Sequence, residues 1–163
     1  MALTQARLRE LLLYNPDSGW FTWRAQPNGR VPAGTRAGTI KKRGNREIKI
    51  DGKLYQSGRL AFFYMTGRWP KPEVDHENGD PDDDRWFNLR EASHTQNMRN
   101  RGRFKSKGTP KGVSWHKGIG LYTARITVNY KTISLGTFDT AEEAADAYER
   151  AAILYFGEFA RED

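Results

Sequence analysis

A basic run in the second half of the chain limits what this sequence can fold into. From Met98 to Lys117 there are seven Lys or Arg residues and no Asp or Glu, interspersed with Gly, Ser, Thr and Pro. The length of 163 residues permits one ordinary domain or two small ones, and patterned segments lie on both sides of the run. The sequence therefore predicts a domain at residues 1–100, a basic linker at 101–110 and a second domain at 111–163.

Positive charge is concentrated in two places within a formal net charge of +7. Besides the run above, the segment from Phe21 to Pro70 holds eleven Lys or Arg residues against only Glu47 and Asp51. Acidic residues gather instead between Glu73 and Glu91 and near the C-terminus. Such local positive fields favour a polyanionic partner such as DNA, although a solvated charged surface is the alternative for each run.

Composition also excludes some classes of protein. There is no Cys, so neither disulfides nor a thiolate zinc site can hold the fold together. The longest early apolar run, Leu11 to Tyr14, is far too short to span a membrane. Charges at Arg7, Arg9 and Glu10 stand where the apolar part of a secretory signal would begin. We therefore expect a soluble cytoplasmic protein without a membrane partner.

The N-terminal part carries helix and hairpin signals. Thr4 can cap a helix in which Leu8, Leu11 and Leu12 share one face, and Asn15-Pro16 is expected to end it. The signals that follow are a strand at Trp20–Trp23, a hairpin that turns at Asp51-Gly52 with Ile48 and Ile50 on one side, and a helix after Ser57. This part is expected to place helices against antiparallel hairpins.

After the basic run the pattern changes to three strands and one helix. The expected strands are Gly112–His116, Leu121–Val128 and Lys131–Phe138, which form an antiparallel meander. Thr140 and Glu143 form a T-x-x-E capping box at the start of the helix. The helical stripe expected to pack on the sheet consists of Ala144, Ala147, Tyr148, Ala151, Ala152 and Tyr155.

The segment that carries chemistry is VDHENGDPDDDRWFNLREASHTQN, from Val74 to Asn97. Ser93 and Gln96 form an S-x-x-Q capping box, which places Asn97 near the first turn of a helix facing back toward the preceding strands. A strand, loop, strand and helix would thus bring together Asp75, His76, Asn88 and Asn97.

These side chains suit phosphodiester hydrolysis, which needs a base near neutral pKa and a hard cation. His76 can be the general base, and Asp75 with Asn97 can hold the cation. One charged and one neutral oxygen ligand favour Mg²⁺ or Mn²⁺ over Zn²⁺, with one ion per site.

At these residues the chain resembles the HNH, or ββα-metal, endonucleases of the phage and intron-encoded group, whose pattern is D-H-x-N-G followed by D-N-R-x-x-N-L-R and a final Asn. The similarity covers roughly residues 3–100, with the ββα-metal motif at about 73–100. It implies His76 as general base, Asp75 and Asn97 as metal ligands, and Asn88 as the catalytic-site group that orients His76. It also implies a homing-type enzyme encoded by a bacteriophage and acting in the bacterial cytoplasm.

Three positions differ from the residues more usual in HNH enzymes. Asn97 stands where many members carry His, Asp84 precedes Arg85 in place of Asn, and Glu77 follows the Asp-His pair. The additional acids could strengthen cation binding or repel DNA, and the sequence leaves this open. His94, three residues before Asn97, is an alternative metal ligand or else an exposed residue of the first helical turn.

Residues 111–161 resemble the AP-two/ERF-type DNA-binding domain of plant ethylene-response factors. That resemblance implies a three-stranded sheet in the major groove with a helix packed behind it. Alternation places five apolar residues toward the helix: Val113, Ala124, Ile126, Ile133 and Leu135. It places five polar residues toward DNA: Ser114, His116, Thr123, Arg125 and Thr127.

Within that outward set Arg125 is the best candidate for a base contact, because Ser114 and His116 stand at two positions where the plant relatives carry Arg. Trp115 and Tyr122 could equally brace the fold or touch DNA. The fold class expected for the whole chain is α+β, with an N-terminal helix and antiparallel hairpins leading into the ββα-metal motif, then a three-stranded antiparallel sheet plus one helix.

The interpretation that follows is a divalent-metal-dependent DNA endonuclease that prefers certain sites and nicks as a monomer, with double-stranded DNA as partner and no small-molecule substrate. Further residues expected on DNA phosphates are Arg99, Arg101, Arg103, Lys105, Lys107 and Lys111 in the linker region, and Lys41, Lys42 and Arg43 in the first domain. The alternatives are a non-catalytic DNA-binding regulator with a degenerate HNH fold, and a virion or packaging accessory that retains DNA.

Overall fold

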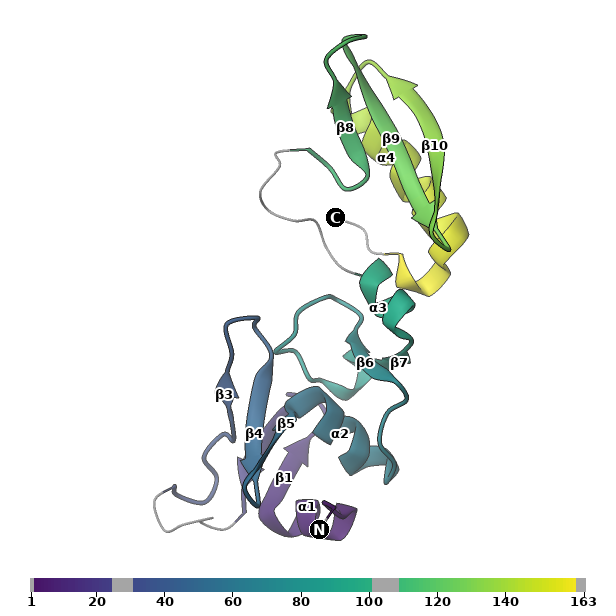
Figure 1. Cartoon of the computed structure of the whole chain (residues 1–163). Helices are drawn as coiled ribbons and strands as arrows, with labels where there is room; N and C mark the ends of the chain where they lie inside the picture. Colours follow the sequence, from purple (N-terminus) through teal and green to yellow (C-terminus); the bar gives the residue numbers. More distant parts are fainter. Residues whose placement is uncertain (1, 25–30, 101–108, 161–163) are drawn as a thin grey trace. The chain divides into compact units, whose positions relative to one another are not determined.

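The computed structural model describes residues 2–24, 31–100 and 109–160. The chain divides into two compact units, Met1–Asn97 and Met98–Asp163 (Figure 1). Both units mix helices with antiparallel sheets, so the predicted α+β class is confirmed. None of the helices in these ranges combines the length and the apolar character that a membrane crossing requires.

In the described residues, unit 1 consists of three small antiparallel sheets and the helices that cover them. Its elements are α1 (Gln5–Leu11), β1 (Leu12–Asn15), β2 (Trp20–Trp23), β3 (Thr39–Ile40), β4 (Arg46–Ile50), β5 (Lys53–Gln56), α2 (Ser57–Thr66), β6 (Glu73–His76), η1 (Trp86–Asn88), β7 (Leu89–Ala92) and α3 (His94–Arg99), whose last two residues belong to unit 2. The strands pair as β1-β2, β3-β4-β5 and β6-β7.

The first helix begins as expected but ends early. The hydroxyl oxygen of Thr4 accepts the backbone N–H of Arg7 at 3.1 Å, which caps α1. The predicted extension through Leu12 is wrong, because the chain turns extended there and β1 pairs with β2. Leu12 and Tyr14 are buried while Leu13 is exposed, which is the period of a strand, and pairing with β2 outweighs local helix propensity.

The hairpin signal is confirmed. Asp51 and Gly52 have φ of 46° and 82°, the pair of positive angles that a two-residue type I′ turn needs. Ile48 and Ile50 are buried on one side of β4, as the alternation predicts. They join a core with α1 and α2, whose buried members are Leu8, Leu12, Tyr14, Phe21, Ala37, Ile48, Ile50, Leu60, Ala61, Phe63 and Leu89.

Unit 2 is a three-stranded antiparallel sheet with one helix on it. Its elements are β8 (Val113–His116), β9 (Leu121–Val128), β10 (Lys131–Phe138), α4 (Ala141–Phe156) and η2 (Gly157–Phe159), with β9 in the middle of the sheet. Figure 1 shows α4 lying along one face of this sheet. Both halves of the predicted Thr140–Glu143 capping box are formed.

The helix packs through a stripe of mostly small residues. Ala144, Tyr148, Ala151 and Ala152 are buried, as predicted, over Val113, Ala124 and Ile126 of the sheet. Tyr155 was expected in the stripe and is 42 % exposed; Phe156 is buried in its place. The period of 3.6 residues does not distinguish the two, because Tyr155 follows buried Ala151 by four residues and Phe156 follows buried Ala152 by four.

Candidate active site

Strands β6 and β7 form the frame of the site. They pair antiparallel with Asp75 opposite Arg90 and His76 opposite Leu89, and residues 77–88 connect them. Successive side chains of a strand point to opposite faces, so Glu73 and Asp75 share one face and His76 lies on the other. The segment from β6 through β7 to α3 is the strand, loop, strand and helix that the sequence predicts.

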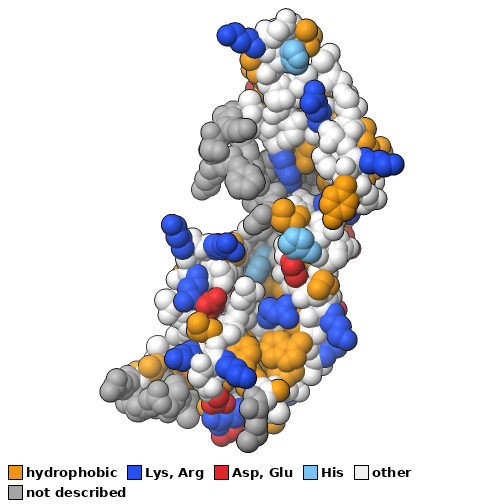
Figure 2. Space-filling view, in the orientation of Figure 1, with side chains coloured by type: hydrophobic (Ala, Val, Ile, Leu, Met, Phe, Trp, Pro, Cys, Tyr) orange, Lys and Arg blue, Asp and Glu red, His pale blue; other side chains and the backbone are white. Residues whose placement is uncertain are grey.

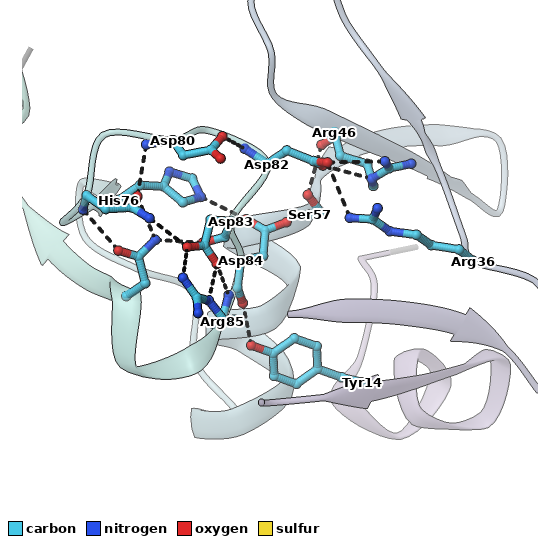
Figure 3. Close-up of polar contacts among 12 residues, drawn as sticks. Tyr14, Arg36, Arg46, Ser57, His76, Asp80, Asp82, Asp83, Asp84 and Arg85 are labelled. Carbon is cyan, nitrogen blue, oxygen red and sulfur yellow. Dashed lines mark hydrogen bonds and ion pairs between the residues drawn. The ribbon is translucent and has the colours of Figure 1, made fainter. Parts of the chain in front are cut away.

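His76 is held by a buried carboxylate. Its Nε2 lies 2.8 Å from Oδ1 of Asp84, whose side chain is only 2 % exposed (Figure 3). The pair lies against Gly58 at the start of α2, where an added Cβ would stand 2.8 Å from Oδ1 of Asp84 and 3.4 Å from Nε2 of His76. A glycine at position 58 is therefore needed for the pair to approach the helix.

The three consecutive acids of the loop each have a cationic or imidazole partner. Asp82 accepts hydrogen bonds from Nε of Arg46 at 2.9 Å and from the guanidinium of Arg36 at 3.3 Å. Asp83 is paired with Arg85, which holds the pKa of that carboxyl below its usual value, and Asp84 is paired with His76. Their charge is thus compensated locally, which bears on the question of cation binding or DNA repulsion left open by the sequence.

Asn88 braces the loop that leaves His76. Its Nδ2 donates to the backbone oxygen of Asp83 at 2.7 Å, and its Oδ1 accepts the backbone N–H of Asn78 at 3.0 Å. The backbone oxygen of Asn88 also accepts the N–H of Glu77 at 2.9 Å. These bonds fix the residues on either side of the loop, so Asn88 acts on His76 through the backbone, whereas the side chain bonded to the imidazole is Asp84.

Asp75 and Asn97 lie on the other face of β6 with their own partners. Asp75 is buried, and its Oδ2 accepts Nε of Arg90 at 2.9 Å. Asn97 donates through Nδ2 to Oε2 of Glu73 at 2.6 Å, and the other oxygen of Glu73 lies 2.9 Å from Nδ1 of His94. Hydrogen bonds from His94 and then from Asn97 lower the pKa of Glu73.

This donor set fits a hard divalent cation. When Asn97 donates through its nitrogen to Glu73, its amide oxygen is left to act as a ligand, while Asp75 is paired with Arg90. Across residues 2–24, 31–100 and 109–160 no cluster of three or more Asp, Glu or His side chains is arranged to hold a metal ion. A site of one carboxylate and one amide would need water and a phosphate oxygen to complete it.

The predicted phosphate contacts of unit 1 lie on a hairpin tip beside the loop. Lys41, Lys42 and Arg43 are exposed between β3 and β4, and Lys41 pairs with Glu47 at 3.4 Å. Figure 2 shows Lys and Arg side chains gathered at the end of the unit where Figure 1 places this hairpin. A Cβ added to Gly44 would lie 2.7 Å from Pro81, so the tip packs against the loop after His76.

On the sheet of unit 2 most of the polar set is exposed, but Thr123 is not. Ser114, His116, Arg125 and Thr127 are exposed. Thr123 is only 6 % exposed, and its hydroxyl donates to the backbone oxygen of Ser114 at 3.2 Å. It shares the outward face but lies on the central strand, where neighbours on both sides cover a short side chain, so its expected exposure to DNA is corrected.

The basic residues at the edge of the linker have partners within unit 2. Arg99 donates to Oδ1 of Asn129 at 3.3 Å and lies over the ring of Phe156, and Lys111 donates to the backbone oxygen of Arg99 at 2.9 Å. Arg101, Arg103, Lys105 and Lys107 lie outside the described residues. Trp115 and Tyr122 meet edge to face at 4.8 Å, which makes bracing of the sheet one of their roles.

Comparison with known families now assigns both units. A profile of the HNH endonuclease family matches residues 56–99, and an AP2 domain profile matches residues 109–158. The chain carries an HNH endonuclease domain followed by an AP2 domain. The HNH match begins beside Gly58 and ends after Asn97, so it contains the whole β6–β7–α3 site, and the AP2 match contains the sheet and α4.

The chain is also similar to several plant transcription factors. The AP2-like ethylene-responsive transcription factor ANT of Arabidopsis thaliana is 29 % identical over 142 residues, covering 79 % of this chain and 26 % of that protein. The factors AIL5 of Arabidopsis thaliana and CRL5 of Oryza sativa subsp. japonica are each 43 % identical over 63 residues, covering 34 % of this chain and 11 % and 10 % of theirs. The chain thus spans about a quarter or less of the length of these relatives.

The sequence did not predict the residues of the β1–β2 hairpin that hold the backbone at Asp84 in place. Tyr14 donates its hydroxyl to the backbone oxygen of Asp84 at 2.6 Å, and burial raises the pKa of that hydroxyl. A Cβ on Gly19 would overlap the backbone of Asp84 and Arg85. The sequence signals at these positions were the turn Asn15–Gly19 and the glycine after Ser57. Neither signal predicts that these residues contact Asp84 or His76.

Proposed function

We propose that this protein is a divalent-metal-dependent DNA endonuclease in which the HNH domain cuts and the AP2 domain positions it on double-stranded DNA. The observation that carries the proposal is the HNH match over a site in which the imidazole of His76 is fixed by a buried carboxylate. An imidazole held in one orientation, directly after the proposed ligand Asp75 in the chain, is suited to deprotonate a water near a phosphate.

Each side chain of the site has a role in this proposal. His76 accepts a proton from the water that attacks phosphorus while the bond to the departing sugar oxygen breaks. Asp75 and Asn97 would hold one Mg²⁺ or Mn²⁺, which would neutralise charge on the phosphate and on the departing oxygen. Asn88 keeps the loop after His76 in place. One such site per chain favours a monomer that nicks one strand.

The AP2 domain and the basic surfaces supply binding. Phosphate contacts are assigned to Lys41, Lys42 and Arg43, to Arg99 and Lys111, and to the linker residues Arg101, Arg103, Lys105 and Lys107. On the sheet Arg125 is the candidate for reading a base edge, with Ser114, His116 and Thr127 beside it. The resemblance to phage enzymes favours a homing-type role in a bacterial cytoplasm.

A second candidate is a non-catalytic DNA-binding regulator, because the curated relatives are named transcription factors. Both candidates bind DNA through the AP2 domain, so only cleavage separates them.

Metal removal is the first test of the proposal. Purified full-length protein with supercoiled plasmid and Mg²⁺ or Mn²⁺ is expected to produce nicked circles, and EDTA is expected to stop the reaction, because the pair Asp75 and Asn97 cannot neutralise the departing oxygen without an ion. Agarose gels separate the two forms. DNA binding without nicking in either metal would favour the regulator.

The ligand assignment has its own test. Asp75→Ala and Asn97→Ala are each expected to raise the metal concentration for half-maximal nicking by about tenfold or more, since each removes one of two protein ligands. Titration of Mn²⁺ at fixed DNA measures this. Asp17→Asn, a change of an exposed acid in the β1–β2 turn, is the control and should titrate like the wild type. Identical titrations for both ligand variants would remove them from the site.

A further inference from the structure

Asp84, the hydrogen-bond partner of His76, lies in a loop but is buried and held by hydrogen bonds to other elements. Asp84 as a whole is 1 % exposed, and its backbone oxygen accepts the hydroxyl of Tyr14 at 2.6 Å. Two residues later, the backbone N–H of Trp86 donates to the oxygen of Pro16 at 2.9 Å. The loop is therefore tied to the β1–β2 hairpin at Asp84 itself and two residues after it.

The space around the carboxylate is closed from the side of α2 as well. A Cβ added to Gly58 would come to 2.8 Å from Oδ1 of Asp84 and to 3.4 Å from the ring of His76. Figure 3 shows the two side chains directed toward one another beside the start of this helix. Burial and these contacts leave the carboxylate directed at the imidazole.

The chemistry of the pair fixes which nitrogen carries the proton. An ionised carboxylate can only accept hydrogen bonds, so Nε2 of His76 must donate across the 2.8 Å contact. A neutral imidazole protonated on Nε2 has its lone pair on Nδ1. We propose that Asp84 is a positioning residue that holds His76 with its proton on Nε2 and thereby makes Nδ1 the atom that accepts the proton of water.

This inference deepens the proposed function and rests on it. It also gives a reason for one departure from the usual pattern, since Asp84 stands where D-N-R would have Asn. A hydrogen bond from imidazole to a carboxylate is charge-assisted and stronger than one to an amide oxygen. The acid at this position therefore orients the base and is not an added ligand for the metal.

The test combines single-turnover nicking by the full chain with proton NMR of the imidazole N–H. Asp84→Ala is expected to lower the single-turnover rate by about 100-fold while DNA affinity stays within about threefold, because the base is misoriented and DNA contacts are untouched. Asp84→Asn, whose amide oxygen can accept the same bond, should recover part of the rate. Asp17→Asn, which also removes one negative charge, is the matched control.

NMR provides a signal that does not depend on cleavage. The chain has only three His residues, so ¹⁵N-labelled histidine and the His76→Ala variant suffice to assign the N–H proton on Nε2 of His76. In the wild type this proton should resonate at low field and exchange slowly with water. It should disappear in Asp84→Ala and persist at a higher field in Asp84→Asn.

Several results would overturn the inference. One is a wild-type protein that lacks the slowly exchanging proton, and another is an Asp84→Ala variant that retains it. Nicking by Asp84→Ala within about threefold of the wild type, with His76→Ala inactive, would do the same. If Asp84→Ala does not fold, Asp84→Asn decides, and loss of DNA affinity in step with its nicking would mean a structural role. Activity retained in His76→Ala would instead refute the role of His76 as general base in the proposed function, while the proton signal still tests the pair.

Discussion

His76→Ala is expected to lower the rate of nicking by about 1000-fold or more while leaving DNA affinity within about threefold of the wild type. The large effect follows because the site as proposed contains one group able to take the proton of water at neutral pH. The small effect follows because a half-buried neutral imidazole paired with Asp84 contributes little to phosphate binding. Rates come from plasmid nicking with excess enzyme, and affinities from binding in Ca²⁺ or EDTA.

His94→Ala is the matched comparison, because it makes the same change on the same domain. The ring of His94 is bonded to Glu73 and its side chain is 76 % exposed, so we expect nicking within about threefold of the wild type. A large rise in the metal requirement of His94→Ala would instead make it a ligand, the alternative that the sequence left open. If His76→Ala cut within tenfold of the wild type, the general base would have to be another group.

Features governed by local rules could be predicted from the sequence. The Ser93–Gln96 capping box is formed as expected. The backbone N–H of Gln96 donates to Oγ of Ser93 at 3.2 Å, and the backbone N–H of Ser93 donates to Oε1 of Gln96 at 2.8 Å. It starts the helix that carries Asn97. The strands β9 and β10 also span the expected residues. The alternation of apolar and polar side chains along each strand, and the turn between them, depend only on residues that are close in sequence.

Features that depend on distant partners could not be predicted. Strand β1 forms only because β2 is available to pair with residues that also suit a helix. The contact of Asp84 with His76 crosses the loop and depends on Gly58, Gly19 and Tyr14, which come from three other places in the chain. A pattern of residue types shows that acids are present but not that each has a partner.

Burial on a sheet shows the same limit. Alternation correctly placed Thr123 on the outward face of β9, yet the side chain is covered, because the register sets it between Ser114 and Thr137 on the two flanking strands. Arg125, two residues further on the same face, is long enough to remain exposed. Side-chain length and position in the sheet decide what can reach a DNA groove.

Gly112→Ala is expected to unfold unit 2 and to remove most of the DNA affinity and site preference without removing nicking. Gly112 has φ of 73°, and a Cβ there would overlap the ring of Tyr148 and lie 2.7 Å from the backbone oxygen of Arg125. Strain at positive φ and overpacking against backbone together cost about 3 kcal/mol or more, which is comparable with the whole stability of a domain this small and lowers its melting temperature by about 12 to 24 °C. Thermal melts and cleavage maps on a random-sequence library measure both effects.

Gly120→Ala separates backbone strain from overlap, because Gly120 has φ of 69° but no atom within 4 Å of an added Cβ. Gly120→Ala should lower the free energy of unfolding by only about 1 kcal/mol and keep site preference. Both variants place a side chain at positive φ, but only Gly112→Ala adds an overlap with Tyr148 and Arg125. The nuclease residues lie in the other unit, and the ion and base proposed there act on any phosphodiester, so Gly112→Ala should still nick in Mn²⁺. If it nicked with unchanged site preference, the reading surface would have to lie in unit 1, where the exposed hairpin tip of Lys41, Lys42 and Arg43 packs beside the catalytic loop.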